Sequence, residues 1–399
     1  MDADVVVIGA GALGLSTALH CAMSGRSVIV VERHTAGSQA SGRAAGLFKS
    51  VQADELRTRL ARRSITRAVT FADWAGTPLA VARSGSLLIA RTAQHREFLR
   101  RELVQSRRWG ADVREAAHPR LSYYRAVGDD FALWCPEDVY IDEPASLIQA
   151  CLAACRRHGA EVSENEPVIR ITVTAGRVAG IETRHRSIAA PVVVDAAGAW
   201  VRHVAELAGA RVPVSTVRHQ LLITAPAADV DPADPITRVV DAAVYLRPAR
   251  GGLMVGGFES DPLPVDPRHR PASFTTDDVP LDLGVLRRLA AQVSAEAPAA
   301  QSPFAELRGG LFTMSPDGRF VAGPVLPGLW VASGCNGSGF SSSLAIGEAL
   351  ATWITSGTPP PGLAELSPGR FGPLPDDALL SRGLWQYAHY YDPTAPDVD

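Results

Sequence analysis

An α/β fold is predicted by three features of the sequence. Residues 4–32 read as an apolar strand, a helix and a second apolar strand, which together make a parallel βαβ unit. Residues 217–258 alternate strands with a glycine-bearing turn, which is typical of a hairpin. The chain has 399 residues, which is too long for one ordinary core. We therefore expect two domains, one on a parallel sheet and one on a mostly antiparallel sheet.

The other elements follow from apolar periodicity and from the positions of glycine and proline. The predicted helices cover residues 9–25, 50–80, 92–110, 281–297 and 336–357, of which the last begins with glycines, and residues 140–162 form a helix that leads into a strand. The predicted strands cover residues 4–9, 27–33, 84–91, 167–195, 217–226, 242–258 and 316–334, with turns at Ala175–Gly176 and Gly251–Gly252. Residues 259–280 are rich in proline and aspartate and are expected to form a loop.

Composition excludes several classes of protein. The formal net charge is −3, whereas a general nucleic-acid binder needs a basic surface. The start, MDADVVVIGAG, lacks the basic region of a signal peptide, and its apolar run is too short to span a bilayer. We therefore expect a cytoplasmic protein, monomeric or homo-oligomeric, that binds neither nucleic acid nor membrane.

The cysteines predict neither a disulfide framework nor a metal site. There are five, an odd number, and none forms a CxxC pair. Cys151 and Cys155 would share a helix face, but no histidine or cysteine completes a zinc pattern around them. We expect reduced, mostly structural thiols, in agreement with a cytoplasmic protein.

A glycine pattern at the N-terminus predicts a dinucleotide site. Gly9, Gly11 and Gly14 form GxGxxG between the first strand and the first helix. They permit a tight turn, close approach of a pyrophosphate, and close packing of helix and strand, respectively. Glu32 ends the second strand, where an acid binds ribose hydroxyls. Glu32 followed by Arg33 argues against NADP and leaves NAD and FAD open; a plain tight turn is the alternative interpretation.

Four separated stretches resemble one family. They read DVVVIGAGALGLSTALHCAMSGRSVIVVER, SGRAAGLF, VVVDAAGAWVRHVAELAG, and LRGGLFTMSPDGRFVAGPV followed by GLWVASGCNGSGFSSSLAIGEALATWI. In this order they resemble the FAD-dependent D-amino-acid oxidase superfamily, particularly the branch of glycine oxidase, sarcosine oxidase, dimethylglycine dehydrogenase and D-arginine dehydrogenase. The resemblance covers roughly residues 3 to 356 and adds a specificity that no single motif carries.

The resemblance implies FAD as the cofactor. The family lays the segment SGRAAGLF along the flavin and points the helix after Gly337 at the pyrimidine edge of the ring, where negative charge develops on reduction. It holds the adenine end through the backbone of Val168. The residues assigned to FAD in this way are Gly9, Gly11, Ala12, Leu13, Gly14, Glu32, Arg33, Ser41, Arg43, Ala44, Ala45, Leu47, Val168, Ala197, Gly198, Trp200, Gly334, Gly337, Ser338, Gly339, Phe340 and Ser341.

The same resemblance implies a discontinuous domain arrangement. A Rossmann-like FAD-binding domain of the glutathione-reductase type would comprise residues 1–85, 145–212 and 305–370. A substrate domain on a mostly antiparallel sheet would comprise residues 86–144 and 213–304. Residues 371–399 form an aromatic tail, which either docks on the surface, the interpretation we prefer, or covers the site or an oligomer interface.

Covalent attachment of the flavin is not expected. Some relatives use a histidine just before the small-residue run, and that position falls on Arg43. Others use a cysteine at a position that falls on Gly310, with Cys335 well away from it. We therefore predict non-covalent FAD.

The activity implied is oxidation of the C–N bond of an amino acid or N-substituted amine, by hydride transfer to flavin N5, with O₂ or another acceptor reoxidising the flavin. Arg308 matches the position that binds the substrate carboxylate, as a guanidinium does with two donors. Tyr245 matches a tyrosine over the substrate pocket, with an ordinary strand tyrosine as the alternative. Arg218 either reaches the pocket or caps the sheet, which we prefer.

Lys49 is the only lysine of the chain and follows the flavin-lining segment by two residues. Some relatives place a lysine near the flavin to help O₂ accept an electron, but Met254 occupies the matching position here. Lys49 is the candidate to supply this charge, and a solvent-exposed lysine is the alternative. For the whole protein, two other hypotheses remain: a flavin enzyme acting on a larger natural-product scaffold, and a non-catalytic FAD-binding subunit.

Overall fold

The computed structural model describes residues 1–117 and 121–392, so residues 393–399 of the predicted tail lie outside the described residues. Its first sheet has six strands in the order β18-β19-β12-β1-β2-β8. All neighbours are parallel except β18 and β19, which are antiparallel. The strands are β1 (Val5–Ile8), β2 (Val28–Val31), β8 (Glu161–Ser163), β12 (Val192–Asp195), β18 (Val321–Leu326) and β19 (Leu329–Ser333).

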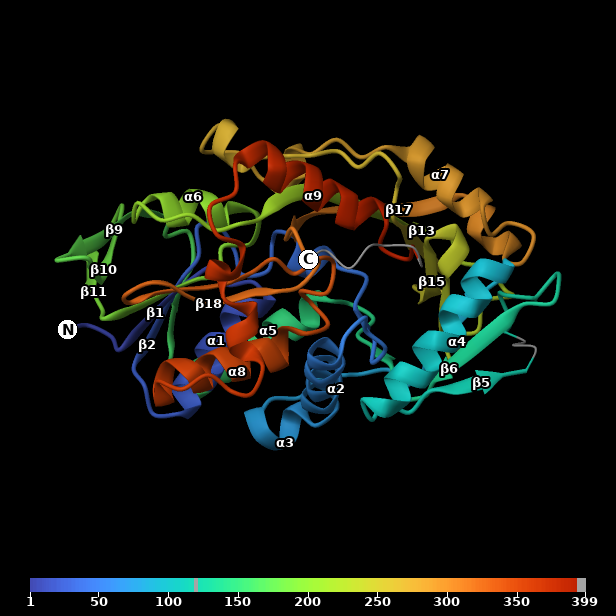
Figure 1. Ribbon diagram of the computed structural model, residues 1–399, viewed down its shortest axis with the longest axis horizontal. Coiled ribbons are helices and arrows are strands. Elements are labelled where there is room, and N and C mark those ends of the chain that lie inside the picture. The colour runs from blue at the N-terminus through green and yellow to red at the C-terminus, as the bar shows by residue number, and fades with distance from the viewer. Residues whose placement is uncertain (118–120, 393–399) are drawn as a thin grey trace.

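Both faces of this sheet are covered, as the continuous apolar sequence of β1 and β2 requires. Helices α1 (Ala12–Met23), α5 (Ala145–Arg157) and α8 (Ser343–Ser356) pack on one face, as Figure 1 shows. A three-stranded antiparallel sheet of β9 (Val168–Thr174), β10 (Arg177–Thr183) and β11 (Ser187–Ala189) packs on the other. Helix α1 ends before Gly25, whose φ is 79°, so the predicted βαβ unit is confirmed.

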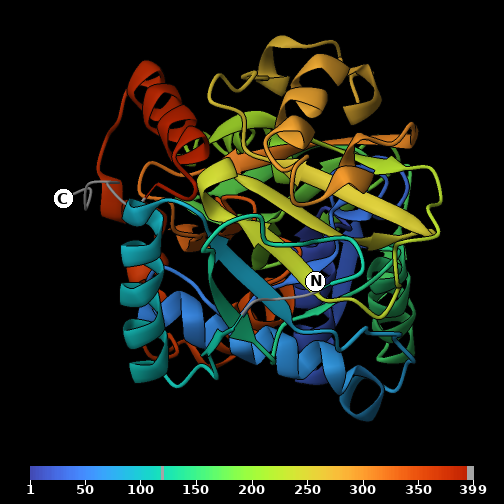
Figure 2. The ribbon, with the colours of Figure 1, turned by 90° about the vertical axis from the view of Figure 1, so that its right-hand side faces the viewer.

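The second large sheet has eight strands in the order β17-β13-β16-β15-β14-β4-β6-β5. Neighbours are antiparallel except β14 and β4, which are parallel. In Figure 2 its yellow strands lie in front of the blue strands of the six-stranded sheet. The strands are β4 (Ser86–Ala90), β5 (Arg114–Ala116), β6 (Phe131–Cys135), β13 (Ser215–Thr224), β14 (Ile236–Val239), β15 (Val244–Ala249), β16 (Gly252–Gly257) and β17 (Phe304–Met314).

The fold class predicted from the sequence is thus confirmed, with local differences. The hairpin turn lies at Arg250 and Gly251, one residue before the predicted pair, because these two residues have φ of 52° and 76°. Strand β17, which the sequence pattern did not single out, pairs with β13 along its whole length. The predicted domain boundary at residue 305 therefore falls within this sheet; the division into domains itself stays a prediction.

The observed helices are shorter than the predicted ranges, and residues 50–80 contain two helices, α2 (Glu55–Val69) and α3 (Phe71–Ala75). Helix α7 spans Leu283–Ala291 rather than residues 281–297. Helix α8 begins at Ser343 and not at the glycines, because Asn336 and Gly337 adopt φ of 47° and 77°, which an α-helix does not tolerate. The remaining elements are α4 (Ala93–Arg108), α6 (Val201–Glu206), α9 (Asp376–Ala388), β3 (Leu47–Phe48) and β7 (Val139–Tyr140).

Helix α9 lies in the predicted aromatic tail. It packs against β13 and β17, and Figure 1 shows it along the upper part of the molecule. Its buried residues are Leu379, Gly383 and Tyr387, so the helix docks on the surface through one face, as preferred, while the residues at its end reach the cavity described below. Among the described helices, none combines the length and apolar character needed to cross a bilayer.

Candidate functional site

A cavity of about 700 Å³ is lined by residues of both large sheets, from Ile8 and Val31 in one to Leu221 and Gly309 in the other. All the site residues predicted from the sequence line it, except Gly14, Gly334 and Ser338. The structure thus brings segments from the start, middle and end of the chain to one place. Among residues 1–117 and 121–392, no group of three or more histidines, cysteines or acids is placed to hold a metal ion.

The glycine fingerprint lies at one end of the cavity and has the geometry a dinucleotide needs. Gly9 has φ of 104°, and a Cβ there would lie 2.6 Å from the carbonyl oxygen of Ala196. A Cβ at Gly14 would lie 2.0 Å from the oxygen of Gly9, so this glycine serves helix–strand packing, which explains its place outside the lining. Gly11 caps α1, and its added Cβ would narrow the cradle toward Ser41 Oγ, at 3.1 Å. The fingerprint therefore fits a pyrophosphate.

Glu32 fixes this loop as well as facing the cavity. Its carboxylate accepts hydrogen bonds from the backbone N–H groups of Ala10 and His34, both at 2.9 Å. Arg33, the next residue, places its guanidinium over the ring of Trp200, 5.1 Å from the centroid. Arg33 and Trp200, which were both predicted to bind the dinucleotide and are far apart in the sequence, are therefore in contact.

The segment of residues 41–47 runs along the cavity and is held by a buried arginine that the sequence did not reveal. Arg247 is completely buried and donates to the carbonyl oxygen of Ala45, at 2.9 Å, and to Asp142, at 2.8 Å. A Cβ at Gly46 would lie 2.1 Å from the oxygen of Ile141. The sequence gives no signal that distinguishes Arg247, because nearly all the basic residues of this chain are arginines.

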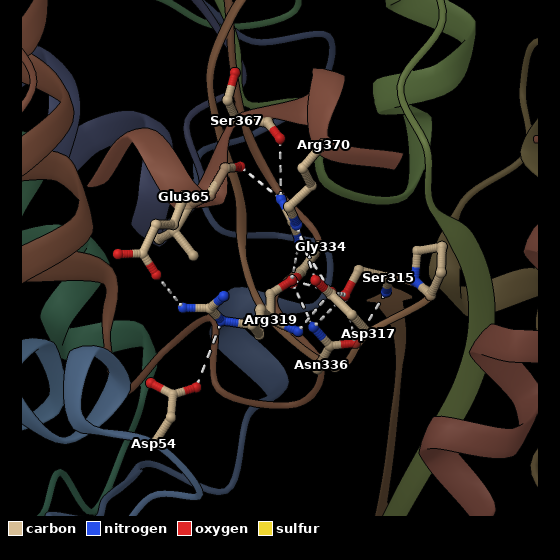
Figure 3. A network of polar contacts seen from close by, with 12 residues as sticks. Asp54, Ser315, Asp317, Arg319, Gly334, Asn336, Glu365, Ser367 and Arg370 are labelled. Carbon is tan, nitrogen blue, oxygen red and sulfur yellow. Dashed lines mark hydrogen bonds and ion pairs between the residues drawn. The ribbon is translucent and has the colours of Figure 1, made fainter. Parts of the chain in front are cut away.

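The glycine loop at 334–341 is fixed by the polar network of Figure 3. Asn336 accepts a hydrogen bond from the Ser315 N–H, at 2.9 Å, and its amide donates to the oxygen of Gly334, at 2.6 Å. Ser315 also contacts Asp317, which pairs with Arg370 at 2.8 Å. Gly337, Gly339, Phe340 and Ser341 form this wall of the cavity, and Gly334 and Ser338 support it from outside the lining.

Arg308 reaches the cavity from β17, and one nitrogen of its guanidinium has no hydrogen-bond partner. It is 8% exposed and pairs with Glu306 through Nε and with Glu143 through Nη2, at 3.2 Å. Its Nη1 is buried without a hydrogen-bond partner. Because a buried unpaired guanidinium nitrogen is costly, it indicates a place for an anionic group.

Tyr245 belongs to a chain of buried polar rings. Its hydroxyl lies 2.9 Å from His219 Nε2, and the hydroxyl of Tyr387 lies 2.8 Å from Nδ1 of the same ring. Burial lowers the pKa of His219 to about 3, so the imidazole is neutral and donates to one tyrosine while accepting from the other. His219, beside Arg218 in the sequence, was not predicted, although it lines the cavity.

Lys49 also points into the cavity rather than into bulk water. Its ammonium contacts the hydroxyl of Tyr390 and lies 4.3 Å from the centroid of that ring. Burial lowers the pKa of Lys49, and the charge of Arg238 adds to this effect. Tyr390, Tyr391 and Arg238 line the same region and were not predicted as site residues.

The structure also shows where three other residues discussed in the sequence analysis lie relative to the cavity. Arg218 does not line the cavity but pairs with Glu259 at 3.2 Å, which agrees with its preferred structural interpretation. Met254 packs in a small apolar cluster with Leu221 and likewise does not line the cavity. Cys335, which the sequence places well away from the attachment position at Gly310, lines the cavity and is the one cysteine that is not buried; its backbone N–H donates to Thr313 Oγ1 of β17, at 3.2 Å.

The fold and the cavity together define a dinucleotide-binding protein whose second sheet closes the far end of the site. A family model described as FAD dependent oxidoreductase (DAO) matches residues 4–353, and the chain belongs to that family. Its cofactor is therefore FAD, as predicted.

Curated relatives agree with this membership. The chain is 30% identical over 378 residues to human mitochondrial sarcosine dehydrogenase, with 90% of this chain and 40% of the relative covered. It is 28% identical over 365 residues to 4-methylaminobutanoate oxidase (formaldehyde-forming) of Paenarthrobacter nicotinovorans, covering 89% and 44%. It is 25% identical over 407 residues to the mouse mitochondrial pyruvate dehydrogenase phosphatase regulatory subunit, covering 96% and 44%. The chain thus spans less than half the length of these relatives.

Solved structures share the fold. L-proline dehydrogenase from P. horikoshii superposes with a TM-score of 0.82 at 21% identity, covering 93% of this chain and 98% of that one. Glycine oxidase from Geobacillus kaustophilus superposes with a TM-score of 0.76 at 23% identity, covering 92% and 98%.

Proposed function

We propose that the protein oxidises the C–N bond of an amino acid or N-substituted amine that carries a carboxylate. The observation that carries this proposal is Arg308, a buried cation with an unpaired Nη1 in the cavity that also contains the dinucleotide fingerprint. The names of the relatives, a sarcosine dehydrogenase and a methylaminobutanoate oxidase, support the same class of substrate.

FAD, when bound, supplies the hydride acceptor for the carbon that bears the nitrogen, and the imine product then hydrolyses in water. The contribution of the chain is to bind and orient the substrate. Arg308 offers Nη1 to the carboxylate, and Glu143, whose side chain is 45% exposed, can leave Nη2 to give a second donor. Tyr245 would border the reacting group, with its hydroxyl oriented by the neutral His219.

The role of Lys49 in reoxidation is part of this proposal. A cation in the flavin cavity stabilises superoxide as O₂ takes its first electron, and Lys49 is placed in that cavity. O₂ is accordingly the electron acceptor we favour, in a cytoplasmic enzyme. An unchanged rate of flavin reoxidation by O₂ in Lys49→Met would remove Lys49 from the mechanism.

The test of the function is anaerobic bleaching of the flavin absorbance near neutral pH. Sarcosine, N-methyl amino acids, D-amino acids and proline are added singly to the oxidised holoprotein. Bleaching by one of them is expected. After hydrolysis of the imine, release of ammonia, methylamine or formaldehyde identifies the bond oxidised in an acyclic substrate, whereas proline gives a cyclic imine that keeps its nitrogen. Bleaching only by a larger scaffold would contradict the proposal in favour of a natural-product oxidoreductase.

A second candidate function is a non-catalytic FAD-binding subunit. The relative named as a phosphatase regulatory subunit, which matches 96% of this chain, favours it. An intact flavin that no amine bleaches, but that dithionite reduces, would support this candidate and contradict the enzymatic proposal.

A further inference from the structure

The C-terminal segment of residues 387–391, here called the terminal aromatic segment, forms part of the cavity wall. Tyr390 and Tyr391 line the cavity. Tyr387 is completely buried and holds the ring of His219 through a 2.8 Å hydrogen bond. A segment from the very end of the described chain therefore completes the compartment that Tyr245 and Arg308 border.

Tyr390 is held in this wall by contacts of both its ring and its hydroxyl group. Its ring stacks on Phe258, with centroids 3.9 Å apart and planes 6° apart, and Tyr391 meets both rings edge-on. Its hydroxyl contacts the ammonium of Lys49. Burial alone would raise the pKa of this phenol, but the charge and hydrogen bond of Lys49 outweigh burial, so the pKa is lowered.

Behind Tyr390 lies an excess of positive charge. Arg238 is 3% exposed and pairs with Asp138 at 2.9 Å, while its Nε has no hydrogen-bond partner. Among the described residues, Asp138 is the one carboxylate that forms an ion pair with Arg238, and none forms one with Lys49. The phenol of Tyr390 thus contacts the ammonium of Lys49, which has no carboxylate partner among the described residues and feels the charge of Arg238.

Helix α9 together with the terminal aromatic segment is fixed at both ends. At the start of α9, Asp376 binds Arg202, Arg211 and Arg268 at 2.5, 2.6 and 2.8 Å. At its other end the tyrosines are held by His219 and Lys49. Helix α9 therefore bridges from the six-stranded side of the molecule to the cavity (Figure 1).

We propose that Tyr390 is a specificity-determining residue: it ends the substrate compartment at Lys49 and prevents that cation from binding a second anionic group of the substrate. The inference rests on the proposed function, since it concerns the compartment for the amine substrate. The protein then selects substrates with one carboxylate, bound at Arg308, and an uncharged remainder.

The test compares glutarate, which has two carboxylates, with butyrate, which has one. Binding is measured by the perturbation of the flavin absorbance, so that no turnover is needed. Tyr390→Ala is expected to bind glutarate at least about tenfold more tightly than the wild type, because a charge-assisted hydrogen bond to Lys49 becomes available. Butyrate affinity should change much less, and the gain for glutarate should disappear in Tyr390→Ala with Lys49→Met.

Equal glutarate affinity in the wild type and Tyr390→Ala, with flavin content retained, would overturn the inference. A gain that persists without Lys49 would do the same. If Tyr390→Ala fails to retain flavin, Tyr390→Leu, which keeps apolar volume beside Phe258, replaces it with the same expected result. Failure of all amines to bleach the flavin would contradict the proposed function alone, because the ligand selectivity is read out separately.

Discussion

At the scale of single residues, the site is assembled from charges that are buried and only partly satisfied. Arg308 has one unpaired nitrogen, Arg238 has another, and Lys49 is covered by a phenol. Such groups cost free energy of folding unless a ligand pairs with them. Their collection in one cavity is therefore the strongest sign, beyond family membership, that the cavity binds an anionic small molecule.

Arg308→Gln tests the carboxylate anchor. Loss of a charge-assisted hydrogen bond is expected to weaken substrate binding by about 2 kcal/mol, which is roughly thirtyfold in KM for a carboxylate-bearing amine. Arg250→Gln is the matched control, since Arg250 is half exposed and binds the same two glutamates, Glu143 and Glu306, without lining the cavity. Equal effects of the two substitutions on KM would show that Arg308 acts only through the glutamates.

His219 predicts a pH dependence of stability. Its pKa falls from 6.5 to about 3 in the folded state because the ring is buried. Below pH 6.5 His219 therefore binds a proton in the unfolded chain but not in the folded chain. The free energy of unfolding consequently declines as the pH falls from 6.5 toward 3. Thermal unfolding at pH 7 and pH 5 should show a smaller loss of Tm in His219→Gln than in the wild type; His20, whose pKa burial lowers to about 4, keeps part of the slope in both. An unchanged difference would contradict a neutral His219.

At the scale of elements, the parts predicted best are those with a strong local signal. The strands of the βαβ unit are apolar runs on both sides of a glycine-led helix, and the turn at Ala175–Gly176 has two residues with positive φ. What could not be predicted depends on distant partners. Strand β17 contains Gly309 and Gly310, which weaken the local strand signal, and its pairing with β13 decides its conformation.

The loop between β19 and α8 gives the element-scale prediction. Asn336→Ala removes hydrogen bonds to Ser315 and Gly334 and puts an alanine at φ of 47°. We expect a loss of about 2–4 kcal/mol in the free energy of unfolding, together with weaker FAD binding, because the loop lines the cavity. Asn336→Gly keeps the conformation accessible and loses only the hydrogen bonds, so denaturant unfolding of the two variants separates the two causes. Equal stability of Asn336→Ala and the wild type would contradict this account of the network.

At the scale of the whole molecule, the cavity exists because segments far apart in the sequence converge on it. Residues within 8–47, 166–207 and 332–341 supply its dinucleotide end, and Lys49, β13, β15, β17 and the terminal aromatic segment supply the other. The family resemblance predicted the first group because its glycines form continuous motifs. It did not predict Arg238, His219 or Tyr390, because nothing in their local sequence reveals that α9 and the eight-stranded sheet bring them together.

Retention of FAD by many separate contacts, rather than by one bond, is the prediction for the whole molecule. Arg43 pairs with Asp277 at 2.6 Å, and Gly310 has no side chain, so neither attachment position of the relatives offers a nucleophile. Acid precipitation should therefore leave a colourless pellet and release all the flavin, since unfolding separates the two sheets that hold it. Cys335 is the control, because its thiol lines the cavity. A yellow pellet from the wild type would contradict non-covalent binding, and its absence in Cys335→Ser would then identify this sulfur as the anchor.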